Sequence, residues 1–254
     1  MARIIAVTNQ KGGVGKTTTA INLSACLAAQ KKKVLLVDID PQGNATSGLG
    51  VGSKNKHTVY DVLIGEARAK DAVVATGHGK LDLIPTAIEL AGAEIELVDV
   101  EKREHLLKHA LDELRGDYDY ILIDCPPSLS LLTINALTAA DSVLIPIQCE
   151  YYALEGLGQL MNTTKLMRKK LNPALEIEGI VLTMFDSRTN LCAQVVDEVK
   201  KHFPRDLFDT MIPRNVRLSE APSFGLPIHL YDARCSGAKA YEALAKEVLE
   251  RRGE

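Results

Sequence analysis

The 254-residue sequence lacks any long apolar run, and this excludes several classes of protein. Residues 34–37 and 121–123 are among its longest apolar runs, far short of the roughly 20 residues that span a bilayer. The first residues also lack the long apolar stretch and the small-residue cleavage site of a secretory signal. We therefore expect a soluble, cytoplasmic protein with no stable membrane association.

Paired cysteines are also missing. The five cysteines are an odd number, widely spaced, with no C-x-x-C pair, which argues against a disulfide framework or a zinc knuckle and favours a reducing compartment. With 46% apolar and 25% charged residues the chain has the composition of a globular protein. Its net charge of −3 permits a nucleic-acid partner without demanding one.

Short apolar runs alternate with longer amphipathic stretches along the whole chain. Strands are predicted over residues 3–8, 34–38, 81–85, 120–124, 142–147, 177–183 and 207–212, and helices over residues 16–30, 87–97, 102–115, 131–139, 153–170, 190–201 and 237–252. This alternation predicts an α/β fold with a doubly wound, mostly parallel sheet and helices on both faces. No linker divides the chain, so residues 1–254 are predicted to form a single domain. Residues 65–81 show little periodicity and indicate no function.

The strongest motif joins the first predicted strand to the first predicted helix. Its glycines let backbone N–H groups turn inward, and the helix N-terminus favours a bound phosphate. Lys16 is suited to neutralise the β- and γ-phosphates of a nucleotide, and the Thr17 hydroxyl to coordinate Mg²⁺. An ordinary glycine-rich turn would require neither the strand before it and the helix after it nor the Gly-Lys-Thr sequence at the junction. The predicted phosphate-binding residues are Lys11, Gly12, Gly13, Val14, Gly15, Lys16, Thr17 and Thr18.

Carboxylates follow two other apolar strands. Asp38 and Asp40 are two residues apart, so the period of a strand places them on the same side, and Pro41 leaves open a plain solvated turn. Asp124 ends the strand at 120–124 and has the form of a Walker B acid, which holds a water of Mg²⁺. Since parallel sheets carry their sites at the carboxyl ends of strands, these acids are expected near the phosphate loop.

A later segment of the sequence indicates which nucleotide base is bound. A guanine-reading N-K-x-D motif is absent; residues 183–186, Thr-Met-Phe-Asp, have Met184 in place of its lysine, which favours adenine. We therefore expect ATP and Mg²⁺ as cofactors.

The phosphate loop resembles the deviant Walker A class, K-G-G-x-G-K-[ST], of the ParA/MinD and nitrogenase iron-protein group. Together with segments 40–46, 124–128, 148–157 and 211–223, in the same order, it makes almost the whole chain resemble the ParA/Soj partitioning ATPases. The resemblance implies a P-loop ATPase fold and hydrolysis of ATP to ADP and phosphate.

It also implies roles for individual residues. In an ATP-bound homodimer, Lys11 would reach a phosphate bound by the partner subunit. The catalytic groups are then Lys11, Lys16 and Asp40, which positions the attacking water. Asp38 supports the network of Lys16 and Mg²⁺, so Thr17, Asp38 and Asp124 form the predicted metal site. Pro213 and Asn215 match residues that line the adenine pocket; alternatively, Pro213 only ends a strand.

The same resemblance implies that the protein binds double-stranded DNA without sequence preference, is associated with the nucleoid, and has a centromere-binding partner of the ParB/Spo0J type. Arg188 and Arg217 match the family's DNA-binding arginines, although exposed loop arginines are equally often just solvated.

Two other classes share this phosphate loop. A MinD-like, membrane-cycling ATPase of division-site placement requires a basic amphipathic helix at its end, whereas the last predicted helix here has mixed charge and modest apolar bulk. An iron–sulfur reductase or metal carrier requires paired cysteines. The partitioning ATPase is the preferred prediction, with the MinD-like protein as the alternative.

Overall fold

The structure is a computed structural model that describes residues 1–52, 56–150 and 153–253. One seven-stranded sheet has the order β3-β4-β2-β5-β1-β6-β7, and only the β3–β4 pair is antiparallel. This confirms the predicted α/β fold. The strands are β1 (Arg3–Val7), β2 (Val34–Asp38), β3 (Val74–His78), β4 (Leu81–Ile84), β5 (Tyr120–Asp124), β6 (Ser142–Gln148) and β7 (Glu176–Thr183).

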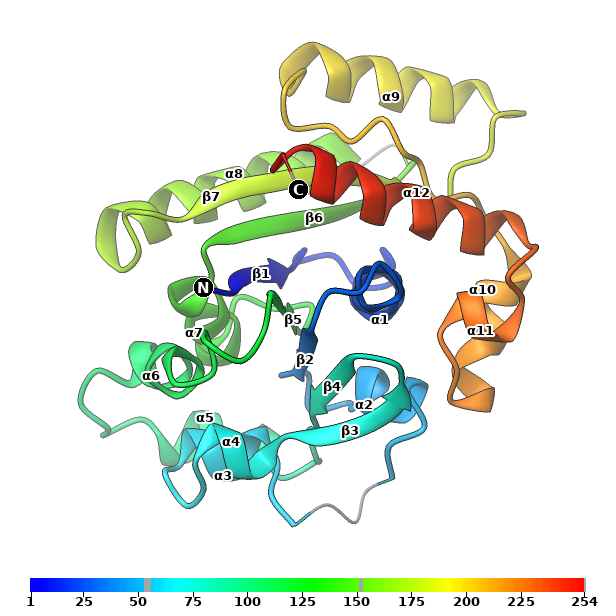
Figure 1. Cartoon of the computed structure of the whole chain (residues 1–254). Helices are drawn as coiled ribbons and strands as arrows, with labels where there is room; N and C mark the ends of the chain where they lie inside the picture. The colour runs from blue at the N-terminus through cyan, green and yellow to red at the C-terminus, as the bar shows by residue number, and fades with distance from the viewer. Residues whose placement is uncertain (53–55, 151–152, 254) are drawn as a thin grey trace.

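Helices cover both faces of the sheet (Figure 1). α1 and α12 pack on one face together with the short C-terminal helices, and α6, α7, α8 and α9 lie on the other. The α-helices are α1 (Lys16–Ala29), α2 (Asn44–Gly48), α3 (Val59–Leu63), α4 (Ala69–Ala72), α5 (Leu90–Glu96), α6 (Leu106–Asp112), α7 (Leu131–Ala139), α8 (Ala153–Lys170), α9 (Asn190–His202), α10 (Val216–Glu220), α11 (Ile228–Tyr231) and α12 (Ser236–Glu250). The 3-10 helices are η1 (Arg103–His105) and η2 (Ala221–Phe224).

The central strands are apolar on both faces because both faces are covered. All five residues of β2 are buried, and they alternate between two clusters: Leu35 and Val37 belong to one, Val34 and Leu36 to the other. The same holds for β5, which lies between β2 and β1. Because both strands are covered on both sides, they fix the positions of the acids at their ends: Asp38 at the end of β2 with Asp40 just after it, and Asp124 at the end of β5.

Two strand assignments differ from the sequence prediction. Residues 207–212 form no strand: the segment is tied to β7 by a single bridge of Leu207 with Ile180, and a second bridge joins Pro213 to Phe185. β3 was not predicted, because its Val-Ala-Thr-Gly-His sequence carries little apolar signal, and it pairs only with β4 at the edge of the sheet. Tyr151 and Tyr152, part of the family-like segment 148–157, lie outside the described residues.

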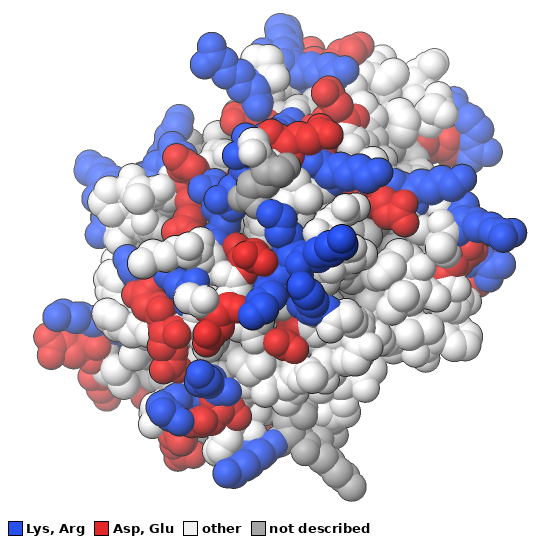
Figure 2. All heavy atoms as spheres, in the orientation of Figure 1, with Lys and Arg blue, Asp and Glu red and all other residues white. Residues whose placement is uncertain are grey.

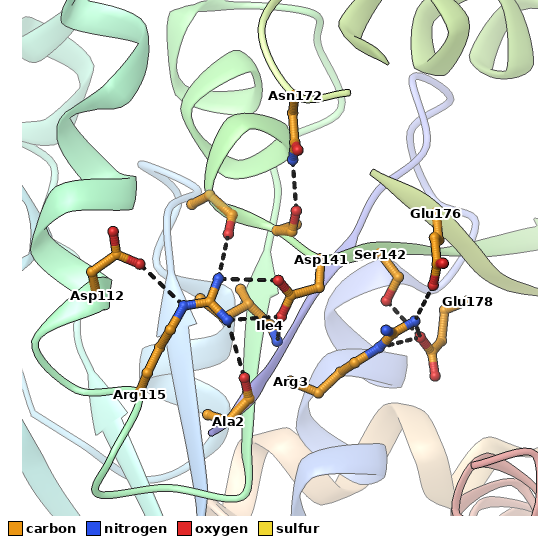
Figure 3. A network of polar contacts seen from close by, with 12 residues as sticks. Ala2, Arg3, Ile4, Asp112, Arg115, Asp141, Ser142, Asn172, Glu176 and Glu178 are labelled. Carbon is orange, nitrogen blue, oxygen red and sulfur yellow. Dashed lines mark hydrogen bonds and ion pairs between the residues drawn. The ribbon is translucent and has the colours of Figure 1, made fainter. Parts of the chain in front are cut away.

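Partly buried ion pairs fasten the sheet at the end where its strands begin (Figure 3). The Arg115 guanidinium donates to both oxygens of Asp141, at 3.0 and 3.1 Å, and to the Ala2 carbonyl at 3.1 Å. Asp141 in turn accepts from the Ile4 N–H at 2.8 Å, so one side chain ties β1 to the start of β6. Nearby, Arg3 donates to Glu178 of β7 at 2.7 Å.

Candidate nucleotide-binding site

The phosphate loop turns sharply between β1 and α1. Gly13 and Gly15 have φ values of 74° and 84°, in the left-handed region that favours glycine, and Gly15 accepts the first helical bond, from the Thr19 N–H at 2.9 Å. Thr183, at the end of β7, donates its hydroxyl to the Val14 carbonyl at 2.9 Å. The loop is thus held between the ends of two strands, with the start of α1 directly behind it.

Lys16 lies beneath this loop with only 7% of its surface exposed. Its ammonium donates to the Lys11 carbonyl at 3.0 Å. Burial lowers the pKa of Lys16, while the nearby carboxylates of Asp124 and Asp40 act in the opposite direction. A buried cation at the start of a helix is what a bound phosphate requires.

Lys11 points to a different partner from the one the sequence analysis assigns to it. Its backbone N–H donates to the Asn9 carboxamide oxygen at 3.0 Å, and Asn9 is itself buried and bonded to the Pro146 carbonyl at 2.8 Å. The Lys11 ammonium forms an ion pair with Glu150, which follows Cys149 just beyond the end of β6. In the single chain, therefore, the Lys11 ammonium is paired with a carboxylate of its own subunit. The sequence analysis missed Glu150.

Asp38 holds the turn that follows β2. One of its oxygens accepts from the Asp40 N–H at 3.2 Å, and the other accepts from the Thr46 N–H and hydroxyl at 2.8 and 2.7 Å. The Thr46 hydroxyl also accepts from the Thr86 N–H at 3.1 Å, which ties α2 to the end of β4. Burial raises the pKa of Asp38 to about 6 despite these donors. Asp38 thus positions Asp40, and its metal-binding role stays a prediction.

Asp124 is the least satisfied side chain of the site. It is opposite both Val7 and Asp38 in the sheet and is fully buried, yet neither carboxylate oxygen accepts a hydrogen bond from the described residues. Burial raises its pKa well above the usual range; Asp38 adds to this, and Thr17 and Lys16 counteract it. Because a buried carboxylate without donors is costly, this arrangement fits a site that is completed by a cation.

Two adjoining cavities open over the loop. The first, of about 360 Å³, is lined by Gly13, Gly15, Lys16, Thr17, Thr18, Asp40, Gln42, Asn44, Pro127 and Met184. The second, of about 350 Å³, is lined by Gly15, Thr18, Thr183, Met184, Ile212, Pro213, Arg214, Asn215, Leu218, Ser219, Pro222 and Tyr241. They share Gly15, Thr18 and Met184, so together they have the room for phosphates and a base. Lys11, Gly12 and Val14 line neither cavity.

The second cavity contains both residues that were predicted to bind adenine. Pro213 follows Ile212, whose carbonyl accepts from the Phe185 N–H at 3.0 Å. Asn215 caps α10, since its side-chain oxygen accepts from the Arg217 N–H at 2.8 Å and its amide donates to the Ser236 hydroxyl at 2.8 Å.

The two arginines predicted to bind DNA are exposed and paired within the chain. Arg188 donates to both oxygens of Asp186, at 2.8 and 2.7 Å, and this contact lowers the pKa of Asp186 to about 2. Arg217 donates to Glu220 at 2.8 Å. Both follow the carboxyl end of β7, on the side of the cavities. Exposed pairs of this kind are weak, so a stronger anion can displace the carboxylates.

Neither a metal-type cluster nor a spanning helix is found in the part of the chain that the structure describes. No three His, Cys, Asp or Glu side chains gather there as a metal site. A cation beside Asp124 would therefore depend on Thr17 and on ligand oxygens, as suits Mg²⁺, which takes few direct protein ligands. No helix within the same residues is long and apolar enough to cross a bilayer.

Comparison with known proteins agrees with this geometry. A family model described as an AAA domain matches residues 2–177. The chain is 64% identical over 249 residues to the sporulation initiation inhibitor protein Soj of Bacillus subtilis (strain 168), covering 98% of each. It is 54% identical over 254 residues to the chromosome-partitioning ATPase Soj of Treponema pallidum (strain Nichols), covering 100% of each. The crystal structure of cobyrinic acid a,c-diamide synthase from Mycobacterium smegmatis with bound ADP and magnesium has a TM-score of 0.88 at 40% identity, covering 100% of this chain and 96% of that one.

Proposed function

The chain belongs to the ParA/Soj family of chromosome-partitioning ATPases, and we propose that it acts in DNA segregation as an ATP-gated homodimer that binds duplex DNA without sequence preference. Its relatives make it an ATPase. The proposal concerns the rest: the cofactors ATP and Mg²⁺, the dimer, DNA, a partner of the ParB/Spo0J type, and a cytoplasmic, nucleoid-associated location.

The observation that carries the proposal is the buried, unpartnered Asp124 carboxylate beside Lys16 and Thr17. Mg²⁺ bound with ATP would supply the missing positive charge and offset the charge of the phosphates. Thr17 would bind the ion directly and Asp124 through a water. A structural neighbour with bound ADP and magnesium supports this assignment.

Hydrolysis needs little more than positioning and charge neutralisation, since phosphoryl transfer has no covalent step on the protein. The Asp40 carboxylate lines the phosphate cavity, and one of its oxygens accepts from the Gln42 N–H at 3.0 Å, which fixes its orientation. We assign Asp40 to orienting the attacking water. Lys16, and Lys11 of the partner subunit, would neutralise charge on the phosphates as the bond to the leaving group breaks.

In this scheme ATP would link two subunits because the Lys11 ammonium exchanges a partner in its own chain for the nucleotide of the other subunit. In the single chain its ammonium contacts Glu150. In the dimer it would leave Glu150 for the nucleotide phosphate of the other subunit, as an arginine finger does. Arg188 and Arg217 of both subunits would then form a single surface for DNA phosphates.

The test is fluorescence anisotropy with a labelled duplex of arbitrary sequence, with Mg-ADP or Mg-ATP, in an Asp40→Ala background that blocks hydrolysis. We expect tight, salt-sensitive binding with ATP alone, and its loss with Lys11→Ala. Arg188→Glu and Arg217→Glu should each weaken binding equally on unrelated sequences. ATP-gated binding that survives both arginine changes would contradict the assignment of Arg188 and Arg217 as the DNA contacts, and ATP-dependent flotation with liposomes would favour the MinD-like alternative.

A further inference from the structure

The helix α5 and the turn that leads into it are apolar on two sides. The buried side carries Leu90, Ala93 and Leu97, which belong to the core cluster on one face of the sheet. Their spacing, three residues and then four, is that of one side of a helix. The same spacing recurs on the exposed side, in the residues Ile88, Ala91, Ile95 and Val98.

These four exposed residues, which we call the α5 seam, form one continuous stripe. The helical path extends past both ends of α5, because the Ala91 N–H donates to the Ile88 carbonyl at 3.1 Å and the Val98 N–H to the Ile95 carbonyl at 3.2 Å. Ile88, Ile95 and Val98 are 67%, 78% and 54% exposed. A single exposed apolar residue is ordinary, but a row at helical spacing indicates a contact surface.

Acidic residues flank the seam. Residues 88–101 contain five acids and no Lys or Arg. Glu94 directly precedes Ile95 and Asp99 directly follows Val98, so the helix places them on either side of the seam. Within the described residues, neither carboxylate has a hydrogen bond or an ion pair. Figure 2 shows Asp and Glu side chains at the left edge of the molecule, over the connection between α5 and α6 in Figure 1.

The basic residues that follow α5 do not cancel this charge. Arg103 donates to the Val98 carbonyl at 2.5 Å, at the end of the helical path, and its guanidinium lies 3.5 Å from Glu104. Lys102 directly follows Glu101 and offsets at most one carboxylate. Three carboxylates along the seam are left over, those of Glu89, Glu94 and Asp99.

Apolar spacing and charge together select one class of occupant. Apolar residues three and four apart pack against a second helix with the same spacing, and the charges beside the seam decide which helix pairs with it. A second copy of α5 would bring like charges together, which disfavours self-pairing. The phosphates of DNA and the surface of an anionic membrane would be repelled in the same way.

We propose that the α5 seam docks an amphipathic helix of a partner protein, with apolar residues at the matching spacing and Lys or Arg beside them. That helix buries Ile88, Ile95 and Val98 and places its cations against Glu94 and Asp99. The inference goes beyond the proposed function, because neither ATP, the homodimer nor DNA takes part in this contact.

The seam begins beside the nucleotide site. Ile88 borders a hollow of about 270 Å³ that is also lined by Gln42 and Thr46. The Gln42 N–H donates to Asp40 at 3.0 Å, and the Thr46 hydroxyl donates to Asp38 at 2.7 Å. A helix seated on the seam therefore adjoins the turn that holds both acids.

The probe is a fluorescent peptide of about three heptads, with Leu at the a and d positions and Lys at e and g, where the lysines oppose self-pairing. A scrambled peptide has the same composition without the spacing. Anisotropy without nucleotide compares wild type, the seam variant Ile88→Ser/Ile95→Ser and the control Leu166→Ser/Leu191→Ser, which changes exposed apolar residues of α8 and α9. Circular dichroism melting verifies that both variants fold.

We expect the ordered peptide to bind wild type and control alike, and the seam variant roughly tenfold more weakly, because two isoleucines no longer contribute apolar area. The scrambled peptide should bind all three proteins weakly. Equal binding of the ordered peptide to seam variant and control would overturn the inference, as would no binding to wild type at about 1 mM peptide. Equal binding of both peptides to wild type would overturn it too, since attraction between charges would explain that result.

A charge exchange tests the flanking acids. Glu94→Lys/Asp99→Lys should bind the lysine peptide roughly tenfold more weakly than the equally charged control Asp209→Lys/Glu250→Lys, whose positions are exposed and distant in sequence. It should bind a peptide with Glu at e and g more tightly than that control does. If both peptides bind the two variants equally, the acids do not face the occupant and the inference fails.

Gel filtration coupled to light scattering, without nucleotide, tests the second copy as the occupant. Wild type and seam variant should have the same mass. A wild-type dimer that is lost in the seam variant and kept in the control would show that α5 pairs with another copy of this chain, and would overturn the assignment to a partner protein.

Discussion

At the scale of single residues, the charged groups of the site are either buried without a partner or paired within the chain. Asp124 is buried without a donor, and the partner of Lys11 is a carboxylate, where the proposed dimer would offer it a phosphate. The sequence predicts Asp38, Asp40 and Asp124 because acids after apolar strands are easy to recognise. It could not predict Glu150, because the contact of Glu150 with Lys11 joins segments that are remote in the chain. Nor could it predict Thr46, whose bonds to Asp38 form only once the turn after β2 has folded.

The Lys11–Glu150 pair competes with dimer formation in the proposed scheme. We expect Glu150→Gln to lower the ATP concentration at half-dimerisation by up to about fivefold, since a half-exposed pair contributes about 1 kcal/mol at most. Light scattering coupled to gel filtration, in the Asp40→Ala background, measures this. Glu250→Gln, at the end of α12, is the control. A higher ATP requirement would mean that Glu150 supports the dimer instead.

The raised pKa values of Asp38 and Asp124 give the nucleotide-free protein an unusual pH dependence. Both acids keep their protons in the folded state at pH values where the unfolded chain, with a pKa of about 3.9, has lost them. Their contribution to stability is therefore present near pH 4 and is lost as the pH rises, through about 6 for Asp38 and through the raised pKa of Asp124.

Removing the charge of Asp124 should flatten that dependence. We expect the melting temperature of the wild-type protein to fall more between pH 5 and pH 8 than that of Asp124→Asn, with no nucleotide present. Asp209→Asn, at an exposed position, should behave like the wild type. Parallel curves for wild type and Asp124→Asn would contradict the assignment. ATP hydrolysis should be lost in Asp124→Asn.

At the scale of elements, α1 joins the phosphate loop to the C-terminal segment. The Asn22 side-chain oxygen accepts from the Ile228 N–H at 2.7 Å, and the Thr19 and Tyr241 hydroxyls lie 3.1 Å apart. Six of the seven strands are predictable to within a few residues, because they are apolar runs. The edge strand β3 is not, and residues 207–212 show the opposite error: an apolar run that packs beside β7 without forming a ladder.

Asn22 can be tested as the link between these elements. Asn22→Ala leaves the buried Ile228 N–H without an acceptor, so we expect a loss of about 1–3 kcal/mol in the free energy of unfolding by urea. Asn190→Ala, at the exposed start of α9, should change it by less than about 0.5 kcal/mol. Similar values for the two variants would show that α1 and α11 are held together by apolar packing alone.

At the scale of the whole molecule, the two ends of the sheet serve different purposes. The amino end is fastened by ion pairs such as Arg115–Asp141, and the carboxyl end carries the two cavities of the nucleotide site and the unpartnered Asp124. This division follows from a parallel sheet, in which strand ends of one kind lie together. The sequence predicts the functional end from its motifs. It does not predict the fastened end, whose pairs join residues far apart in the chain.

Arg115→Met should reveal how much the fastened end contributes. We expect a loss of about 2 kcal/mol in the free energy of unfolding, because Asp141 loses a bidentate partner that is partly shielded from water. Arg68→Met removes an exposed pair with Asp71 on α4 and should destabilise the protein much less, because water screens that pair. Equal losses in urea titrations of the two variants would show that shielding does not matter here.

The Lys11–Glu150 pair also bears on stoichiometry. Since the contact is internal, the proposed symmetric dimer would exchange two internal pairs for two contacts between subunits. An assembly loaded on one side only would leave one lysine with its own carboxylate and gain half as much. On the proposed scheme we therefore expect mixed ATP–ADP dimers to be the short-lived species, and occupancy to rise with ATP more steeply than for independent sites. The first hydrolysis in either subunit would then be enough to begin the release of both.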